Sequence, residues 1–283
     1  MNYCKIEYVK DSRPAIEGAG VRLRRAIGNG DPYEFDPFLL FDDFRSTNPL
    51  DFMPGFPWHP HRGIETVTYM LEGSVEHGDS LGNLGVIGAG DIQWMTAGSG
   101  IIHQEMPKPA KDNKMGGLQL WINLPQQKKM ITPRYYEVKN NDIPLITEAN
   151  GAKVKVIAGN YKGTKGAAKD LFVDCSYFDI WVPAYEQIEF HVGKNYTVFA
   201  YVLEGDGYLS PVDDKHSKAN QLVKLIPNET FLAQAEENPL HFIFVSGMPL
   251  KEPIAWRGPI VMNTQEELIQ AYDDLDNNTF IKK

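Results

Sequence analysis

The sequence is poor in cysteine and has no long apolar run. Only two cysteines occur in 283 residues, Cys4 and Cys175, so we expect no disulfide framework, and a reducing compartment fits. No apolar run approaches the ~18–20 residues of a membrane span. The first residues carry charged side chains such as Lys5 and Asp11, where a signal peptide would have an apolar segment. We therefore expect a cytoplasmic protein without membrane association.

Clustered positive charge is also absent from the sequence. The formal net charge is −9, and no run of basic residues is longer than the pair Lys128-Lys129. A nucleic-acid interface needs clustered cations that replace the phosphate counterions. Direct nucleic-acid binding is therefore not expected. As a separate expectation, we take the chain to be a monomer.

Short strand-like runs separated by Gly, Pro, Asn and Asp dominate the chain instead. Examples are residues 65–73, 90–98 and 118–125. Strands of this length with turns every ~8–12 residues are typical of a sandwich or barrel rather than of alternating β and α units. We predict an all-β chain.

One helix is predicted near the end of the chain. Thr264 and Glu267 have the spacing of a capping box. The residues that follow place four apolar side chains on one helical face, namely Leu268, Ile269, Tyr272 and Leu275.

An internal repeat indicates two domains. Residues 66–73 (TVTYMLEG) resemble residues 198–205 (VFAYVLEG), and two ordinary domains fit a chain of this length. We place the domains at 1–150 and 151–283. The repeat predicts that both domains have one architecture.

The same repeat predicts that only the first copy carries a full set of metal-ligand side chains. Four positions of the first copy can be set against the second, His59 against His191, His61 against Gly193, His103 against His241, and Glu105 against Ile243. A second copy with two histidines and no carboxylate would bind a metal weakly. We expect the second domain to be structural.

The first copy contains two three-residue segments with ligand spacing. His59 and His61 are two apart, as are His103 and Glu105, and side chains two apart on a strand point to the same face. If the two segments lie on neighbouring strands, three imidazoles and one carboxylate converge. That set suits iron, nickel, copper, manganese, cobalt or zinc better than calcium. A closed structural zinc site would favour thiolates, and neither cysteine is near.

Glu65 has several open roles. It lies four residues after His61, which would place it on the same face if one strand ran through both. It could then be an alternative ligand, or an acceptor that orients an imidazole from behind. The alternative is a buried partner for Arg62 or Thr68.

Four apolar residues flank the ligand segments and are candidates for the wall of an aromatic-binding pocket. They are Phe56, Pro57, Trp94 and Met95. For each of them the alternative is an ordinary place in the barrel core.

Other polar residues are expected to have no role in the site. His77 and His216 lie in polar, loop-like sequence, so solvated surface is the expectation. Asp42 and Asp43 are adjacent carboxylates followed by Arg45, and we expect a turn with a local ion pair there rather than a catalytic pair.

Together these motifs resemble the pirin family of the cupin superfamily. The resemblance is carried by HPHRGIETVTYMLEG at 59–73, GDIQWMTAGSGIIHQEMP at 90–107, FDPFLLFDDF at 35–44 and EPIAWRGPIVMNTQEELIQAYDDL at 252–275. It implies two tandem cupin barrels with one metal, held in the N-terminal barrel by His59, His61, His103 and Glu105. The C-terminal barrel would lack a full metal site.

The resemblance leaves two functions open. The family includes dioxygenases that cleave flavonols, which implies a small aromatic enol and dioxygen as substrates. In that reaction Glu105, or alternatively Glu65, would accept the proton of the substrate hydroxyl. The family also includes an iron-dependent transcriptional co-regulator, which implies a non-enzymatic, redox-sensing protein that binds a protein partner. Iron(II) is the first expectation for the metal.

Overall fold

The chain folds into two compact units in the computed structural model, which describes residues 2–28, 30 and 32–282. We call one unit, built from residues 13–140 and the segment that starts at Leu250, the N-terminal barrel. The other, built from the residues up to Ser12 and from Asn141–Pro249, is the C-terminal barrel. Among the described residues, no helix is long and apolar enough to cross a membrane.

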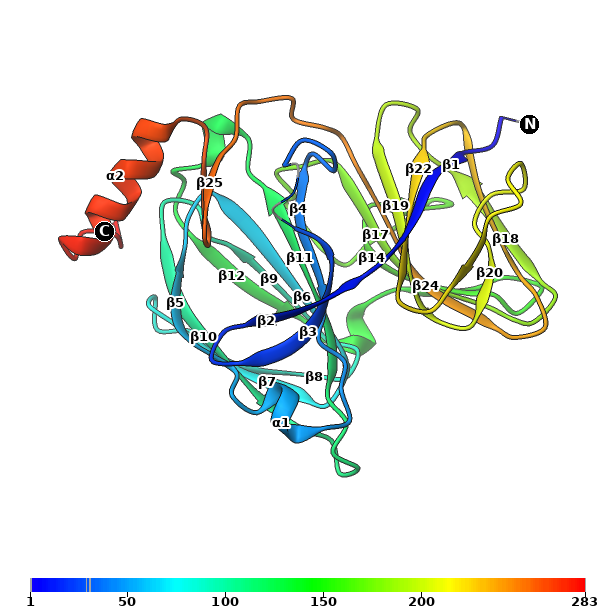
Figure 1. The fold of residues 1–283 in the computed structure, drawn as a ribbon, viewed down its shortest axis with the longest axis horizontal. Helices are drawn as coiled ribbons and strands as arrows, with labels where there is room; N and C mark the ends of the chain where they lie inside the picture. Colours follow the sequence, from blue (N-terminus) through cyan, green and yellow to red (C-terminus); the bar gives the residue numbers. More distant parts are fainter. Residues whose placement is uncertain (1, 29, 31, 283) are drawn as a thin grey trace. The chain divides into compact units, whose positions relative to one another are not determined.

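The N-terminal barrel contains one large and one small antiparallel sheet (Figure 1). The large sheet has the order β12-β9-β6-β11-β4-β3-β2. Its strands are β2 (Arg13–Glu17), β3 (Val21–Ile27), β4 (Phe38–Asp43), β6 (Ile64–Glu72), β9 (Ile92–Thr96), β11 (Gly116–Asn123) and β12 (Arg134–Val138). The small sheet has the order β5-β10-β7-β8, with β5 (Phe56–His61), β7 (Ser74–Asp79), β8 (Leu84–Gly88) and β10 (Ile101–Lys108).

The remaining elements of this barrel are short apart from one helix. They are α1 (Pro49–Phe52), the 3-10 turn η1 (Gln126–Lys128), the hairpin of β25 (Ala255–Arg257) and β26 (Ile260–Met262), and α2 (Gln265–Asp276). A further 3-10 turn, η2 (Asn140–Asp142), follows β12.

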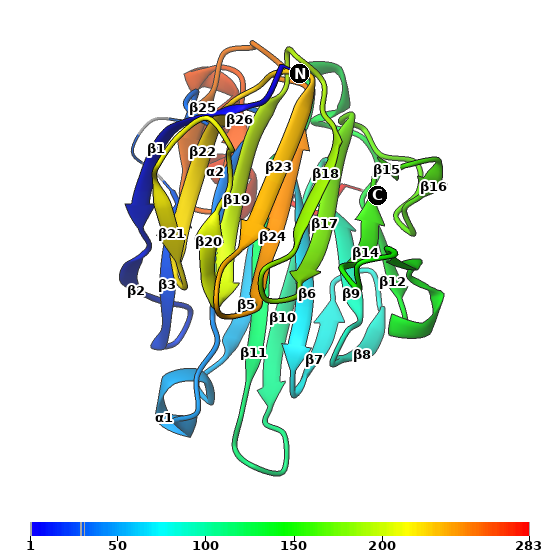
Figure 2. The ribbon, with the colours of Figure 1, turned by 90° about the vertical axis from the view of Figure 1, so that its right-hand side faces the viewer.

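The C-terminal barrel repeats this arrangement (Figure 2). Its large sheet has the order β1-β22-β19-β24-β17-β14-β13, and its small sheet has the order β18-β23-β20-β21. The strands of the large sheet are β1 (Lys5–Asp11), β13 (Leu145–Thr147), β14 (Lys153–Ala158), β17 (Cys175–Val182), β19 (Thr197–Glu204), β22 (Gln221–Ile226) and β24 (Leu240–Gly247). The others are β18 (Gln187–His191), β20 (Asp206–Tyr208), β21 (His216–Lys218), β23 (Thr230–Ala235) and the separate hairpin of β15 (Asn160–Tyr161) and β16 (Thr164–Lys165).

The two strand orders confirm the all-β, two-barrel prediction and show which strands correspond. β6 and β19, which carry the repeated sequence, take the same place in the two large sheets. Each ends at a glycine, Gly73 or Gly205, with a φ of 73°, a backbone region that glycine enters without strain. By the same order β18–β23 corresponds to β5–β10.

This correspondence corrects the predicted alignment of His241 with His103. His241 lies on β24, which corresponds to β11, whereas His103 lies on β10, which corresponds to β23. The prediction added residues to the second copy in order to match the two histidines. The two strands of the second copy's hairpin, β20 and β21, are in fact shorter than β7 and β8.

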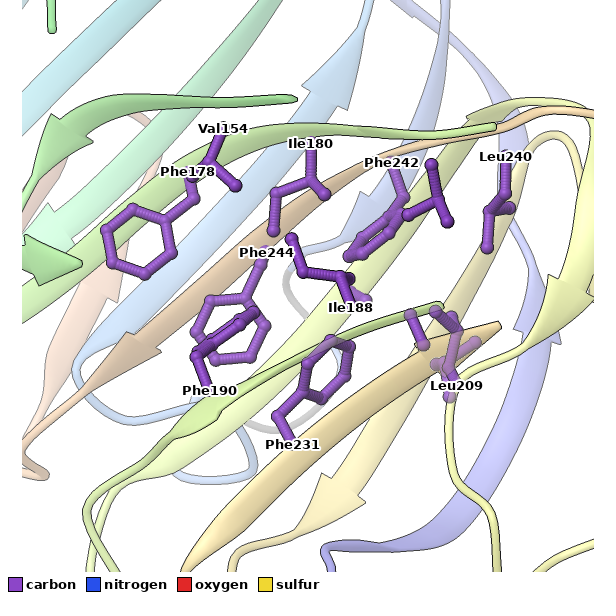
Figure 3. Close-up of a cluster of buried hydrophobic side chains, with 14 of the residues drawn as sticks. Val154, Phe178, Ile180, Ile188, Phe190, Leu209, Phe231, Leu240, Phe242 and Phe244 are labelled. Atoms are coloured by element: carbon purple, nitrogen blue, oxygen red, sulfur yellow. The ribbon is translucent and has the colours of Figure 1, made fainter. Parts of the chain in front are cut away.

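Aromatic side chains fill the interior of the C-terminal barrel. Figure 3 shows five phenylalanine rings that point toward one another from several strands, those of Phe178, Phe190, Phe231, Phe242 and Phe244. The alternating burial of β18 places Phe190 inside and leaves His191 exposed, as the two-residue period of a strand requires. This interior is a packed hydrophobic core.

The observed barrels differ from the predicted ranges 1–150 and 151–283 in three segments: the residues up to Ser12, residues 141–150, and the residues from Leu250. β1 adds to the large sheet of the C-terminal barrel through pairing with β22. The segment after Leu250 returns to the N-terminal barrel, where Arg62 Nη1 lies 2.7 Å from Asp274 Oδ2 on α2. These two are long-range pairings that sequence continuity does not reveal, whereas the third difference is a shift of the boundary, because β13 pairs with β14 in the C-terminal barrel.

The predicted C-terminal helix is confirmed together with its capping box. The Thr264 side chain accepts from the Glu267 amide, and the Glu267 side chain accepts from the Thr264 amide. Leu268 is buried, but Ile269 is 60% exposed. The buried face runs through Leu268, Ala271 and Asp274 instead, so Ile269 was wrongly included in it.

Candidate metal centre

Three histidines converge on the inner face of β5 and β10. His59 pairs directly with His103 in the strand register, and Ile101 pairs with His61. The imidazole centroids lie 4.3 Å apart for His59 and His103 and 5.0 Å apart for His61 and His103. One ring nitrogen from each of the three lies within 4.8 Å of the others. The predicted convergence of the three imidazoles is therefore present.

The hydrogen bonding of these histidines leaves lone pairs available for a metal. Nδ1 of His61 and Nε2 of His103 are buried and have no hydrogen-bond partner. Nδ1 of His59 lies 2.8 Å from the carbonyl oxygen of Pro57, which directs its Nε2 lone pair away from that carbonyl. Unpartnered buried nitrogens are costly unless something binds them, so this group could bind a metal ion.

The environment also keeps the buried imidazoles neutral. Burial lowers the pKa of both His61 and His103 well below the ordinary value, and the neighbouring histidines lower it further. A backbone hydrogen bond to Pro259 opposes this lowering of the His61 pKa but does not reverse it. A neutral imidazole is the form that ligates metals.

Glu105 is buried on the same strand but is not part of this group of three. A register shift separates it from His103 on the β5 side. Its Oε1 accepts from the Thr68 hydroxyl at 3.0 Å, and its Oε2 accepts from Gln119 Nε2 at 3.3 Å. The carboxylate is therefore held in a fixed orientation beside the histidines by two side chains of the large sheet.

Glu65 lies in a different environment. Its Oε1 accepts from the Thr96 hydroxyl at 2.6 Å and lies 3.7 Å from Arg134 Nη2. Burial raises the pKa of this carboxyl. Its hydrogen bond to Thr96 and the charge of Arg134 oppose the rise but do not cancel it. The expected partners Arg62 and Thr68 are not the ones that Glu65 has.

The turn at Gly63 explains why Glu65 does not reach the histidines. His61 and Glu65 do not share one strand, because Gly63, with a φ of 79°, separates β5 from β6. On β6, Glu65 is three residues from Thr68, so their side chains point to opposite faces. Thr68 contacts Glu105, and Glu65 therefore faces away from it.

A cavity of about 450 Å³ opens beside the histidines. His59 and His61 lie on its wall, as do the predicted Phe56 and Pro57. Much of the remaining wall is aromatic, and three indole rings contribute to it, those of Trp58, Trp121 and Trp256. A cavity with apolar walls and a few polar groups is typical of a small-molecule site.

Trp94 and Met95 lie in the barrel core and do not line this cavity. Met95 belongs to a buried cluster with Leu39 and Ile64. Trp94 stacks nearly parallel to Tyr136, with centroids 6.5 Å apart. Core packing, the alternative considered for both residues, describes them correctly.

One part of the cavity wall is polar. Arg25 makes a two-pronged ion pair with Asp42, with N to O distances of 2.8 and 2.7 Å, and also contacts Glu17 at 2.7 Å. Burial raises the pKa of Asp42 to about 6, although the Arg25 guanidinium opposes this shift. The local ion pair that was predicted exists between Asp43 and Arg45, but both aspartates lie on β4 and not in a turn.

His77 is buried on β7 and does not lie on the surface as predicted. The prediction rested on the polar, loop-like sequence around it, but the segment 74–79 is a strand that pairs with β10. His216, by contrast, is partly exposed as expected. Its Nε2 lies 2.9 Å from Glu236 and 3.4 Å from Asp206, and the three side chains form a small polar cluster at the surface.

Sequence reasoning missed the inner face of β11. Gln119 and Trp121 are two apart on this strand, and both line the cavity. Gln119 was recognisable as the polar residue inside an apolar run. Trp256 and Pro259 had no such signal, because they reach the wall from the C-terminal segment.

Known proteins resemble this chain over most of its length. The pirin family model matches residues 20–122, and the model of the pirin C-terminal cupin domain matches residues 177–281. A Pseudomonas aeruginosa protein provisionally named quercetin 2,3-dioxygenase is 42% identical over 265 residues, which is 92% of each chain. A pirin-like protein of Caulobacter vibrioides is 42% identical over 271 residues, covering 95% of this chain and 96% of that protein.

A solved structure has the same overall fold. The crystal structure of a quercetin 2,3-dioxygenase from Acinetobacter baumannii superposes with a TM-score of 0.90 at 32% sequence identity, and the match covers 98% of both chains. The similarity therefore extends across both barrels.

Proposed function

This chain belongs to the pirin family, and on that premise we propose that it is a metal-dependent oxygenase of the quercetin 2,3-dioxygenase type. Its substrates are dioxygen and a small aromatic enol such as a flavonol. The observation that carries the proposal is the group of three histidines, two of them buried with unpartnered nitrogens, beside a cavity to whose wall three indole rings contribute. We place the protein in the cytoplasm, as the sequence predicts.

The proposed ligands are His59, His61, His103 and Glu105. Iron(II) is the first candidate for the metal, with nickel, copper, manganese, cobalt and zinc as alternatives, because three imidazoles and a carboxylate suit each of them. A divalent metal at this site would act as a Lewis acid that makes the enol hydroxyl of the substrate easier to deprotonate. Acceptance of the proton would fall to a side chain close to the histidines.

Glu105 is the proposed acceptor of the enol proton. Thr68 and Gln119 donate to its two carboxylate oxygens, so the lone pairs that remain have a fixed direction. Gln119 also accepts from Trp121 Nε1 at 3.4 Å. A wall indole is thereby linked to the group that orients the base.

The aromatic walls favour a planar substrate. Trp121 stands edge-on to His61, with ring centroids 5.2 Å apart, and lies 6.3 Å from Trp256. Rings at such separations also offer stacking faces to a flat ligand. The cavity volume of about 450 Å³ lies within the range of pockets that hold one small molecule.

The test is oxygen uptake on quercetin by wild-type protein and two glutamate variants. Glu105→Gln should retain bound metal at least in part and lose roughly 10²–10⁴-fold in rate, the usual contribution of a general base. Glu65→Gln is the matched control, because it alters a buried glutamate that faces away from the site, and its rate should stay near that of wild type. Metal content is measured by mass spectrometry.

The contrary result is equally clear. If wild-type protein loaded in turn with iron, nickel, copper, manganese and cobalt takes up no oxygen on quercetin, the proposed reaction is wrong. The non-enzymatic alternative, a redox-sensing regulator that binds a protein partner, would then be favoured.

A further inference from the structure

His77 lies next to His103, on the side of β10 opposite to β5. It lies on β7, next to β10, and its side chain is fully buried. Its Nδ1 is 3.5 Å from Nδ1 of His103, within hydrogen-bond distance. Its Nε2 is buried without a hydrogen-bond partner and faces Oδ2 of Asp79 at 3.6 Å, a distance longer than a hydrogen bond; Asp79 is buried on the same strand. The two imidazoles and the carboxylate form a row that leads to the candidate metal centre.

The geometry fixes which nitrogen carries each hydrogen. A neutral imidazole that offers a lone pair at Nε2, the unpartnered nitrogen of His103, must carry its hydrogen at Nδ1. His103 Nδ1–H then donates to His77 Nδ1. His77 in turn carries its hydrogen at Nε2, the nitrogen that faces Asp79.

We propose that His77 is a positioning residue that holds His103 in the ring orientation and tautomer required of a metal ligand, with the charge of the Asp79 carboxylate favouring the His77 tautomer that carries its hydrogen at Nε2. This inference rests on the proposed metal site. Groups behind a ligating histidine commonly fix its orientation and raise its affinity for the metal. Behind His59 the corresponding group is the backbone carbonyl of Pro57, which a substitution cannot remove. Behind His103 it is the side chain of His77, which can be replaced.

The surrounding contacts keep His77 in place. Its ring stacks on Tyr135 at 4.5 Å with an interplanar angle of 13°. The Tyr135 hydroxyl donates to Glu137 Oε1, and burial together with this carboxylate raises the pKa of Tyr135. The tyrosine therefore stays a neutral donor. Gly85 lies against the pair, and a Cβ there would come within 2.0 Å of Glu137 Oε1.

Asp79 is equally constrained. Its Oδ1 accepts from the amides of Leu81 and Asn83 at 2.9 and 3.0 Å, and its Oδ2 accepts from Asn83 Nδ2 at 2.8 Å. The turn from β7 to β8 thus sets the position of the carboxylate that faces His77.

The experiment compares His77→Leu with His77→Asn. Leucine removes the acceptor for His103 Nδ1–H, whereas the Oδ1 atom of asparagine can replace Nδ1 of His77 as an acceptor. Metal-free proteins are titrated with nickel(II) by calorimetry. We expect His77→Leu to lose about 10- to 100-fold in affinity, the usual effect of such a change, and His77→Asn to stay within about 3-fold of wild type.

A spectroscopic readout separates positioning from general loss of packing. The absorption spectrum of bound cobalt(II) reports ligand geometry, and we expect it to change in His77→Leu and to be restored in His77→Asn. If His77→Leu does not fold, Asp79→Asn replaces it, with the expectation of lower affinity and an altered cobalt spectrum.

Three outcomes would overturn the inference. The first is a His77→Leu protein with wild-type affinity and spectrum. The second is an equal loss in the leucine and asparagine variants, which would mean that the ring serves only to pack. The third, where Asp79→Asn is used, is unchanged binding in that variant. If wild-type protein itself binds no metal, the proposed metal site fails instead, so the two failures are distinguishable.

Discussion

The two barrels have the same strand order but use corresponding inner positions differently. In the N-terminal barrel, β5 and β10 bring His59 opposite His103. In the C-terminal barrel, the corresponding strands β18 and β23 bring Phe190 opposite Phe231, with ring centroids 5.1 Å apart. Imidazoles with free lone pairs occupy one interior, and a closed aromatic cluster occupies the other (Figure 3).

This difference gives the two interiors different roles: the C-terminal one stabilises the fold, and the N-terminal one is suited to binding. Phe231 also lies 4.9 Å from Phe244, and each such ring adds buried apolar area together with favourable edge-to-face contacts. A buried nitrogen without a partner instead costs about 1–3 kcal/mol. The N-terminal barrel therefore carries a local penalty that a bound metal would relieve, whereas the described residues of the C-terminal barrel include no buried side-chain nitrogen without a partner.

The largest predicted effect comes from exchanging one member of each pair. Phe231→Ala should destabilise the C-terminal barrel by ~3–5 kcal/mol, because it leaves a cavity in a dry core, and should leave metal affinity unchanged. His103→Ala should abolish most metal binding and change the stability of the metal-free protein far less. Peptide-resolved hydrogen exchange and metal titration measure the two effects.

Hydrogen exchange is the appropriate probe because a chain with two barrels need not unfold in one step. Faster exchange in Phe231→Ala should be confined to strands of the C-terminal barrel. If Phe231→Ala lowered metal affinity as much as His103→Ala, the division of roles between the barrels would be wrong.

A smaller effect is expected at the indole rings. Trp121 lines the cavity of the N-terminal barrel, and Trp181 stacks on His241 in the C-terminal barrel at 4.5 Å. Trp121→Leu should weaken quercetin binding about 2- to 10-fold, as expected from the loss of ~0.5–1.5 kcal/mol of ring stacking. Trp181→Leu should leave it unchanged. Calorimetry with quercetin measures both affinities. An equal loss of affinity in the two variants would mean that the ligand does not bind in this cavity.

The fold and the histidine group could be predicted because both depend on short-range rules. His59 and His61, like His103 and Glu105, are two apart within one strand, so the alternation of side chains sets their common face. The repeated Leu-Glu-Gly similarly marks the end of β6 and of β19.

Predictions failed where the argument crossed a turn. Glu65 was assigned to the face of His61, but the turn at Gly63 places the two residues on different strands. His241 was aligned with His103 across hairpins of unequal length. His77 was assigned to the solvated surface because its neighbours in sequence are polar, but pairing of β7 with β10 makes this segment a buried strand.

Long-range pairing accounts for the rest of the wall. Arg25 reaches the cavity from β3, and Trp256 reaches it from the segment that returns to the N-terminal barrel after Leu250. Neither residue has a sequence neighbour among the histidines. Only the pairing of strands distant in sequence brings them there.

The most direct test of the division between the barrels is the number and place of bound metal ions. Metal-free protein is titrated with nickel(II), and the anomalous scattering of a nickel-loaded crystal locates the ion. One equivalent per chain, located between His59, His61 and His103, is the predicted result. A second tightly bound ion in the C-terminal barrel, for example at the surface cluster of Asp206, His216 and Glu236, would contradict it.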